Sequence, residues 1–131
     1  MKIIQPSGWP KPKGYANGML ARGQMLFIAG QVGWNENEEM VSERFHEQVR
    51  QVLHNISAIL NEAGALPEHL VRMTWFVTHK SEYEASLKDI GKAYREVIGN
   101  HYPAMTLVEV KSLLEKGAKV EIEATAVIPD N

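Results

Sequence analysis

A single apolar stripe runs through residues 42–63 at helical spacing. Its members recur every three or four positions and are Phe45, Val49, Val52, Leu53, Ile56, Ile59, Leu60 and Ala63. This spacing places them on one face of an α-helix, which has to be buried against another apolar surface. Ser42 is suited to cap the start of the helix, and Gly64 is suited to the left-handed residue just beyond its end.

A second amphipathic helix is predicted between Ser81 and Gly99. Its apolar residues again follow helical spacing and are Tyr83, Leu87, Ile90, Tyr94 and Val97. Ser81 and Glu84 match a capping box, and Gly99 is suited to end the helix. Gly91 lies inside this helix, where glycine costs about 1 kcal/mol relative to alanine. We therefore expect Gly91 to allow close packing of the helix against a sheet.

The remaining apolar segments have the character of β-strands. Three strands are expected, over residues 70–78, 105–110 and 119–128. Two shorter runs, residues 19–21 and 25–29, flank turn residues 22–24 and indicate a β-hairpin. The element order is then hairpin, helix, strand, helix, strand, strand. This order predicts a single two-layer α+β domain, residues 1–131, with a mixed sheet of about five strands and two helices on one face.

The strand at residues 70–78 is apolar on both of its sides. Val71, Met73, Trp75 and Val77 alternate with Leu70, Thr74 and Phe76. In the strand at residues 119–128 only one side is apolar, and Lys119, Glu121 and Glu123 share the other. A strand that is apolar on both sides is usually covered on both sides, whereas the two helices can cover only one face. We therefore expect other copies of the chain to cover the second face.

Composition argues against several classes of function. The chain has no cysteine, so it has no disulfides and no thiolate metal site. Its five histidines include no pair at metal-binding spacing, and its formal charge of −2 argues against binding to nucleic acid. It has neither an N-terminal apolar run nor a segment of about 20 apolar residues, which predicts a soluble, cytoplasmic protein.

Four segments together resemble the Rid family, which is also called the YjgF/UK114 or endoribonuclease L-PSP family. Ala29-Gly30-Gln31 resembles the family's Ser-Gly-Gln after the second strand, and Gly14-Tyr15 resembles its Gly-Pro-Tyr. Tyr102-Pro103-Ala104 with Val108-Glu109-Val110 resembles the family's Pro-Ala-Arg-x-x-Val-Glu-Val strand, and residues 120–124 resemble its closing Val-Glu-Ile-Glu-Ala strand. The resemblance covers nearly the whole chain, with the motifs in the family's order and spacing.

The resemblance implies a chorismate-mutase-like fold and a homotrimer with small-molecule clefts between neighbouring subunits. Well-known members hydrolyse reactive enamines and imines to ketones and ammonia without a metal or organic cofactor, so no cofactor is expected. Glu121 falls on the family glutamate that moves protons in this reaction. On spacing alone Glu123 would serve equally. A polar residue paired with Lys119 or Arg72 is the structural alternative for Glu121.

Further residues of the expected ligand site lie near the second strand. Backbone groups at Ala29, Gly30 and Gln31 can hold the polar end of a ligand, because glycine allows close backbone approach. Gly30 would also suit a β-bulge or a tight strand end, and both roles can hold together. Trp34, three residues after Gln31, is a candidate wall of the cleft, with plain packing as the alternative.

The chain departs from the family at the residue that grips the substrate carboxylate. The family arginine falls on Met105, followed by Thr106, and a thioether cannot replace a bidentate arginine–carboxylate contact. Counting back from Ala29 puts Ala16 on the family tyrosine, and a slip of one residue would restore Tyr15. We expect a larger enamine or imine whose carboxylate is absent, esterified or thioester-linked.

Three functions remain, in decreasing order of support. The first is an enamine or imine hydrolase that uses Glu121 and binds substrate through Tyr15, Met105 and Thr106. The second is a non-catalytic trimer that binds a metabolite or a partner protein, which the loss of the arginine favours. The third is an endoribonuclease, against which the acidic balance and the lack of stacking aromatics among basic residues argue.

Overall fold

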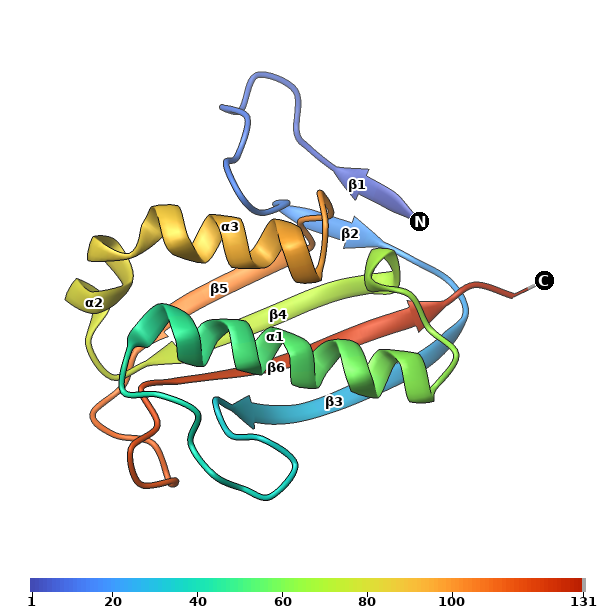
Figure 1. Ribbon diagram of the computed structural model, residues 1–131. Helices are drawn as coiled ribbons and strands as arrows, with labels where there is room; N and C mark the ends of the chain where they lie inside the picture. The colour runs from blue at the N-terminus through green and yellow to red at the C-terminus, as the bar shows by residue number, and fades with distance from the viewer. Residues whose placement is uncertain (131) are drawn as a thin grey trace.

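The computed structural model describes residues 1–130 as a β-sheet with helices packed on one side (Figure 1). In chain order the elements are β1 (Lys2–Ile4), β2 (Gly18–Leu20), β3 (Gln24–Val32), α1 (Phe45–Glu62), the 3₁₀ turn η1 (Pro67–His69), β4 (Leu70–Val77), α2 (Lys80–Ala85), α3 (Leu87–Val97), β5 (Ala104–Glu109) and β6 (Val120–Ile128). The predicted α+β class and the placement of the helices on one face are confirmed. None of the helices in this part of the chain has the length and apolar character needed to cross a membrane.

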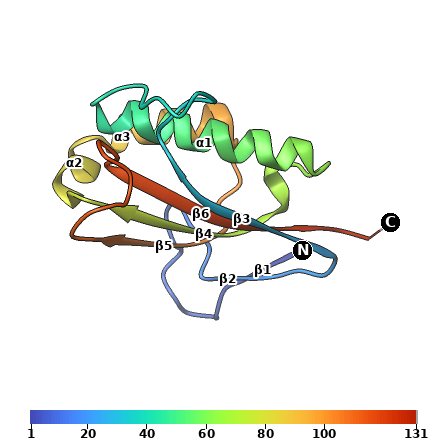
Figure 2. The same ribbon diagram turned by 90° about the horizontal axis from the view of Figure 1, so that it is seen from below.

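The main sheet has four strands in the order β3-β6-β4-β5. β4 and β5 run parallel, while β6 pairs antiparallel with β3 and with β4, so the sheet is mixed. The parallel pair is joined by α2 and α3, because parallel neighbours need a long crossover connection. Figure 2 shows the helices on one side of the sheet and the small β1–β2 ribbon on the other.

The core lies between the helices and the inward face of the sheet. The predicted apolar stripe of α1 is buried, with Val49, Val52, Leu53 and Ile56 fully inaccessible. The inward residues of β4 and β6 meet this stripe and are Met73, Trp75, Val77, Val120, Ile122, Ala124 and Ala126. Burial of each large side chain contributes about 1.5–3 kcal/mol, so this layer supplies most of the driving force for folding.

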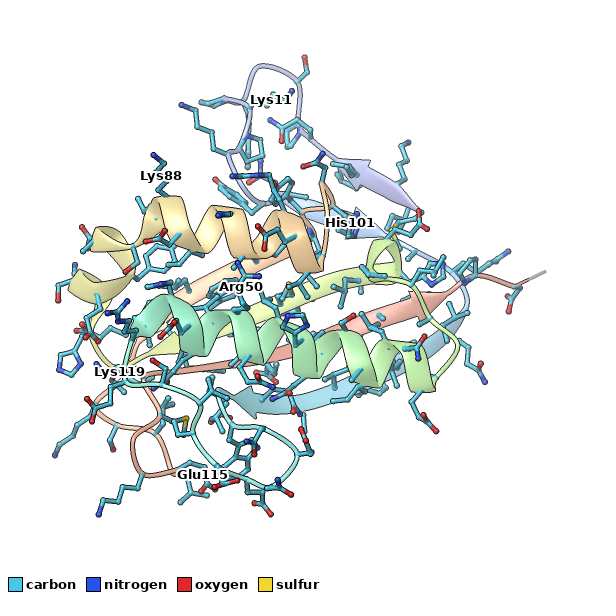
Figure 3. All side chains as sticks on the ribbon, viewed as in Figure 1. Lys11, Arg50, Lys88, His101, Glu115 and Lys119 are labelled. Carbon is cyan, nitrogen blue, oxygen red and sulfur yellow. The ribbon has the colours of Figure 1, made fainter. Side chains whose placement is uncertain are left out.

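An ion pair joins the two long helices across the outer surface of their layer. Arg50 on α1 donates to the Glu96 carboxylate on α3 over 2.7 Å. Figure 3 shows Arg50 in the gap between the two helices. The guanidinium lowers the pKa of the Glu96 carboxyl. Both groups are well exposed to solvent, so the pair orients the helices more than it stabilises them.

The predicted hairpin between residues 19–21 and 25–29 is wrong. β2 pairs with β1, with Met19 opposite Ile3, and β3 pairs with β6 instead. β6 offers β3 a partner along nine residues, whereas β2 is only three residues long. Gly23 allows the close turn, since a side chain there would overlap the Ile128 carbonyl. The main sheet therefore has one strand fewer than expected.

The predicted N-terminal caps of both helices are wrong, whereas the predicted glycines at their ends are confirmed. α1 begins at Phe45 after Arg44, and Ser42 instead accepts a hydrogen bond from the Arg44 N–H over 2.9 Å. The second helix is split in two at Ser86, and the proposed capping box of Ser81 is not formed. The Glu109 carboxylate of β5 accepts the Lys80 N–H over 2.8 Å, so a tertiary contact replaces the local cap. Gly64 and Gly99 do take the left-handed conformation expected of them.

Candidate functional site

The face of the sheet opposite the helices carries exposed apolar residues. Phe27 of β3 is 72% exposed, and Met25 and Val108 are exposed as well. The outward side chains of β6 lie among them, with Glu121 half-buried and Glu123 exposed. The expectation that this face mixes apolar and charged groups is confirmed, and no helix of residues 1–130 covers it (Figure 2).

Glu121 lies against the backbone of β3 at Gly30. A side chain built at Gly30 would overlap the Glu121 carboxylate, with the carboxyl carbon 2.8 Å away. The β3–β6 register shifts between Ile28 and Gln31, so Ala29 and Gly30 form the predicted bulge. A bulge leaves one residue out of the ladder, and its backbone groups become available to a ligand. Glycine is thus required here by the close approach of the Glu121 carboxylate. This carboxylate lies beside the backbone groups that the bulge leaves out of the ladder.

Neither alternative partner of Glu121 is observed. Lys119 binds the Glu82 carboxylate over 3.0 Å, and within residues 1–130 neither Lys119 nor Arg72 forms an ion pair with Glu121. Gln31 folds back locally and donates to the Ala29 carbonyl over 3.0 Å. The Glu121 carboxylate is therefore not engaged by a neighbouring cation in the single chain.

A second group of candidate residues lies at the other edge of the sheet, beside β5. Tyr15, Met105 and Thr106 line one small cavity of about 180 Å³, together with Ala16 and Arg72. Ala16 is buried and donates its N–H to the Pro103 carbonyl over 3.0 Å, which fastens the N-terminal arm to β5. Tyr15 is 43% exposed, so the arm presents the tyrosine side chain and holds Ala16 through its backbone.

One chain does not bring the two groups of candidate residues together. Thr106 pairs with Thr74, and Thr74 pairs with Glu123, so β4 separates β5 from β6. At the usual strand spacing and rise, Glu121 and Thr106 are about 12 Å apart along the sheet. Trp34 follows β3, where Asn55 of α1 holds its carbonyl over 2.9 Å. Gly30 and Glu121 thus lie on the neighbouring strands β3 and β6, and Met105 and Thr106 lie on the opposite edge strand, β5.

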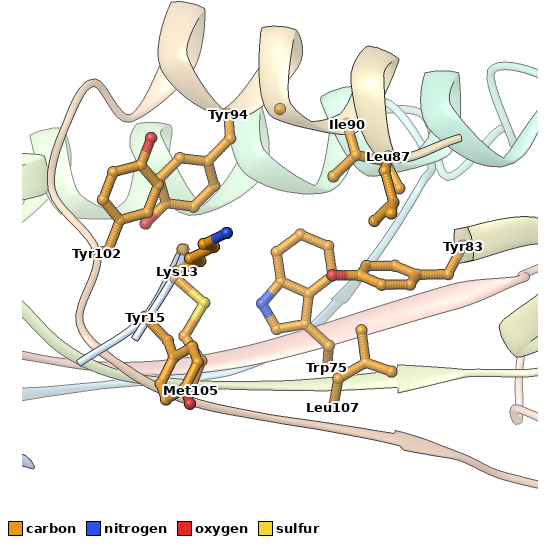
Figure 4. Close-up of a pocket in the computed structure, with 12 residues that line it drawn as sticks. Lys13, Tyr15, Trp75, Tyr83, Leu87, Ile90, Tyr94, Tyr102, Met105 and Leu107 are labelled. Carbon is orange, nitrogen blue, oxygen red and sulfur yellow. The ribbon is translucent and has the colours of Figure 1, made fainter. Parts of the chain in front are cut away.

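A larger cavity, which no sequence pattern predicted, lies between α3 and β5 (Figure 4). Its volume is about 520 Å³, within the usual range of about 300–1,000 Å³ for small-molecule sites. It is lined by Lys13, Gly14, Tyr15, Trp75, Tyr83, Leu87, Ile90, Gly91, Tyr94, Tyr102, Met105 and Leu107, and we call it the aromatic cavity. The apolar pattern of each element predicted core packing for the aromatic residues, and no local signal showed that they leave space between them.

Gly91 opens the aromatic cavity, and its predicted packing against the sheet is wrong. The atoms nearest to a side chain built at Gly91 belong to the Arg95 guanidinium, at 3.1 Å, and none belongs to the sheet. On the far wall, Tyr94 donates its hydroxyl to the His101 carbonyl over 2.6 Å and stacks on Tyr102 at a centroid distance of 5.1 Å. Burial raises the pKa of Tyr94 and of Tyr83, so both phenols stay protonated at neutral pH.

The chain is similar to known proteins over nearly its whole length. The family described as Endoribonuclease L-PSP matches residues 10–128. A RutC family protein of Aquifex aeolicus is 37% identical over 97% of this chain and 99% of its own length. A protein of Dermatophagoides farinae named 2-iminobutanoate/2-iminopropanoate deaminase is 28% identical over 97% of this chain and 96% of its own.

A solved structure shows the same architecture. The Rid-family protein YyfB of Yersinia pestis superposes with a TM-score of 0.85 at 32% identity, covering 97% of this chain and 98% of its own. The chorismate-mutase-like fold expected from the sequence is therefore confirmed. With the family match over nearly all of its length, the chain belongs to the endoribonuclease L-PSP family, which includes the RutC and Rid proteins.

Proposed function

We propose that the protein is an enamine or imine hydrolase that releases ammonia, and that Glu121 moves the protons. The observation that carries this proposal is the Glu121 carboxylate against the Gly30 backbone on the open face of the sheet. The name of the Dermatophagoides relative supports the reaction class. The substrate that we propose lacks a free carboxylate next to the imine carbon.

A cyclic assembly of three chains would complete the site. The two groups of candidate residues lie beside β3 and β5, which are the opposite edges of the sheet. A head-to-tail ring places one edge of each subunit beside the opposite edge of its neighbour. In such a homotrimer Glu121 and Gly30 of one subunit meet Tyr15, Met105 and Thr106 of the next. The exposed apolar side chains of the open face would be buried in the same step.

The chemistry requires a water molecule at the carbon of the C=N bond and a group that moves protons. In the proposed reaction Glu121 takes a proton from the water as the oxygen bonds to carbon and passes it to the imine nitrogen, which gives a carbinolamine. The carbinolamine then collapses: Glu121 carries the hydroxyl proton to the nitrogen, the C–N bond breaks, and a ketone and ammonia leave. Backbone N–H groups at the bulge of Ala29 and Gly30 can hold the polar end of the substrate, whereas the Ala29 carbonyl already accepts the Gln31 side chain.

Met105 sets the proposed substrate apart from simple 2-imino acids. Its side chain packs on the core and lines both cavities beside β5. A thioether offers no N–H group to a carboxylate, whereas an arginine in this place would offer two. The proposed substrate is therefore a larger imine or enamine in which that carboxylate is absent, esterified or thioester-linked.

A second function is favoured by the same residue. Without a cationic clamp at Met105 the trimer would bind a metabolite or a partner protein without turning it over. Endoribonuclease activity is the third candidate, and the formal charge of −2 still argues against it.

The test compares two imines that are generated in situ by oxidation of the parent amines. One carries a free carboxylate and the other the methyl ester, and ammonia release is measured with wild type, Glu121→Gln and Glu123→Gln. We expect turnover of the ester to fall by about 100-fold in Glu121→Gln. Glu123→Gln, which changes a neighbouring exposed carboxylate on the same strand, should match the wild type.

The outcomes separate the candidate functions. Equal turnover of ester and free acid would show that Met105 is no barrier and that the substrate proposal is wrong. Turnover that survives in Glu121→Gln would reject the role of Glu121. A wild type that releases no ammonia from either imine would favour the binding-protein function.

A further inference from the structure

The aromatic cavity contains a buried hydrogen-bond donor that has no partner. Trp75 is only 4% exposed, and its indole N–H finds no acceptor among residues 1–130. A buried donor without a partner is destabilising, so such groups are uncommon unless something binds them. Figure 4 shows the indole nitrogen directed into the cavity, toward the side on which Met105 and Lys13 lie.

Lys13 adds a positive charge to an otherwise apolar cavity. Its exposed side chain comes from the N-terminal arm and reaches over the cavity between Tyr102 and Trp75 (Figure 4). No carboxylate within residues 1–130 forms an ion pair with Lys13. Among the residues of 1–130 that line the cavity, Lys13 is the one cation, and the other polar side-chain groups are the Trp75 indole N–H and the tyrosine hydroxyls.

The walls of the cavity are suited to a flat ring. Trp75 and Tyr83 lie edge to face with ring centroids 6.3 Å apart, and Tyr94 and Tyr102 form a stacked pair opposite them. Rings pack well in offset-stacked and edge-to-face arrangements with such aromatic side chains. Gly91 keeps the helix side open, because any larger residue there would project into the same space.

We propose that the aromatic cavity binds a planar aromatic group that carries an oxygen acceptor, with the Trp75 indole N–H donating to that oxygen. Lys13 strengthens the binding when the oxygen is anionic. As a statement about substrate class this rests on the proposed function: the ring and its oxygen form the part of the substrate remote from the imine carbon. Binding of such a group in the aromatic cavity does not depend on catalytic turnover.

Three probes separate the features of the cavity. 2-Naphthoate carries a ring, an acceptor and a charge, 2-naphthamide carries a ring and a neutral acceptor, and acetate carries an acceptor and a charge without a ring. Affinity is measured by isothermal titration calorimetry, and the tryptophan indole N–H signals are followed by ¹⁵N NMR. We expect both naphthalene probes to bind, acetate not to bind, and the Trp75 signal to shift while those of Trp9 and Trp34 stay in place.

The variants assign each contact. Trp75→Phe should weaken both naphthalene probes by about tenfold, because the ring stays while the donor is lost. Lys13→Met should weaken 2-naphthoate by about two- to fivefold and leave 2-naphthamide unchanged, as expected for an exposed charge. Lys11→Met is the matched control, since Lys11 lies on the same arm outside the cavity lining (Figure 3), and it should change neither affinity.

Gly91→Leu provides a test that does not depend on removing a core residue. Gly91 has ordinary helical backbone geometry and only the flexible end of Arg95 nearby, so the variant should fold at least as well as wild type. Its side chain should fill the cavity and abolish binding of both naphthalene probes. Binding that survives in Gly91→Leu, or an unmoved Trp75 signal on saturation, would overturn the proposal.

The proposal and the proposed function fail in different ways. Glu121→Gln should keep the wild-type affinity for 2-naphthoate even where ammonia release is lost. If neither 2-naphthoate nor 2-naphthamide binds the wild type at millimolar concentration, the aromatic cavity is rejected as a binding site. That result would not bear on imine hydrolysis.

Discussion

The Glu121 carboxylate occupies the space that a methyl group on Gly30 would fill. Gly30 has no positive backbone φ, so its conformation is open to other residues. Its need for glycine comes instead from the carboxylate packed where a side chain would start. A substitution at this position therefore acts on the carboxylate and not on the fold.

Gly30→Ala should displace Glu121 and lower imine turnover by about tenfold or more, because small displacements of a catalytic group are costly. The free energy of unfolding should change by less than about 1 kcal/mol, since the bulge is solvent-exposed. Steady-state ammonia release and urea unfolding measure the two effects. Gly18→Ala, at a glycine where an added Cβ would meet only ordinary contacts, serves as the control and should retain activity. Full activity in Gly30→Ala would contradict the close packing of the carboxylate.

Met105→Arg tests why this chain would avoid simple 2-imino acids. An arginine would offer two parallel N–H groups to a carboxylate, and charge-assisted bonds of this kind contribute about 1.5–3 kcal/mol. We expect the KM for 2-iminopropanoate to fall by about tenfold or more. Met105→Lys brings charge without the planar geometry and should improve KM much less. An unchanged KM in both variants would show that the substrate carboxylate does not reach β5.

At the scale of elements, one buried polar side chain joins three segments of the chain. Gln48 of α1 is fully buried and donates to the carbonyls of Ser42 and Gly117, over 2.9 and 3.0 Å. Its side-chain oxygen accepts the Lys119 N–H over 2.8 Å. It thereby fixes the start of α1 against the β5–β6 connection and the first residues of β6, the strand that carries Glu121.

Gln48→Leu should lower the free energy of unfolding by about 3 kcal/mol, because it leaves buried backbone groups without partners. Gln51→Leu is the control on the same helix. The half-buried Gln51 side chain bonds only to Asn55 within residues 1–130, so its loss should cost less than about 1 kcal/mol. Urea unfolding of both variants at one protein concentration gives the comparison. Equal losses would mean that the Gln48 network does not stabilise the fold.

Sequence periodicity predicts the elements of this fold well and their contacts less well. The α1 stripe and the alternation of β6 are local patterns, and both match the buried residues. The Lys80 cap by Glu109 and the pairing of β3 with β6 join residues far apart in sequence, which no local pattern contains. No local pattern indicated the aromatic cavity for the same reason, since it is a space between an arm, two helices and two strands.

At the scale of the whole molecule, the sheet has the features expected of one subunit of an oligomer. β3 and β5 are its edge strands, and the arm covers only the start of β5, where Ala16 bridges Ala104. The face between the edges carries exposed apolar side chains, which monomers seldom leave uncovered. The candidate residues divide between the same two edges. We therefore predict that association of the subunits also completes the imine-hydrolase site, and a single experiment can test both.

Phe27→Glu should convert a trimer to a monomer without unfolding it. Phe27 is 72% exposed in one chain, so a charge costs the isolated fold little, whereas burial of that charge in a subunit interface is unfavourable in every subunit. Sedimentation velocity at micromolar concentration should give the mass of three chains for wild type and of one chain for the variant, with unchanged circular dichroism. Leu66→Glu, at an exposed apolar residue just after α1, should remain trimeric.

Because the site would need residues from two subunits, Phe27→Glu should also lose imine turnover while Leu66→Glu keeps it. A monomeric wild type, or a monomeric Phe27→Glu variant with full turnover, would contradict the shared site.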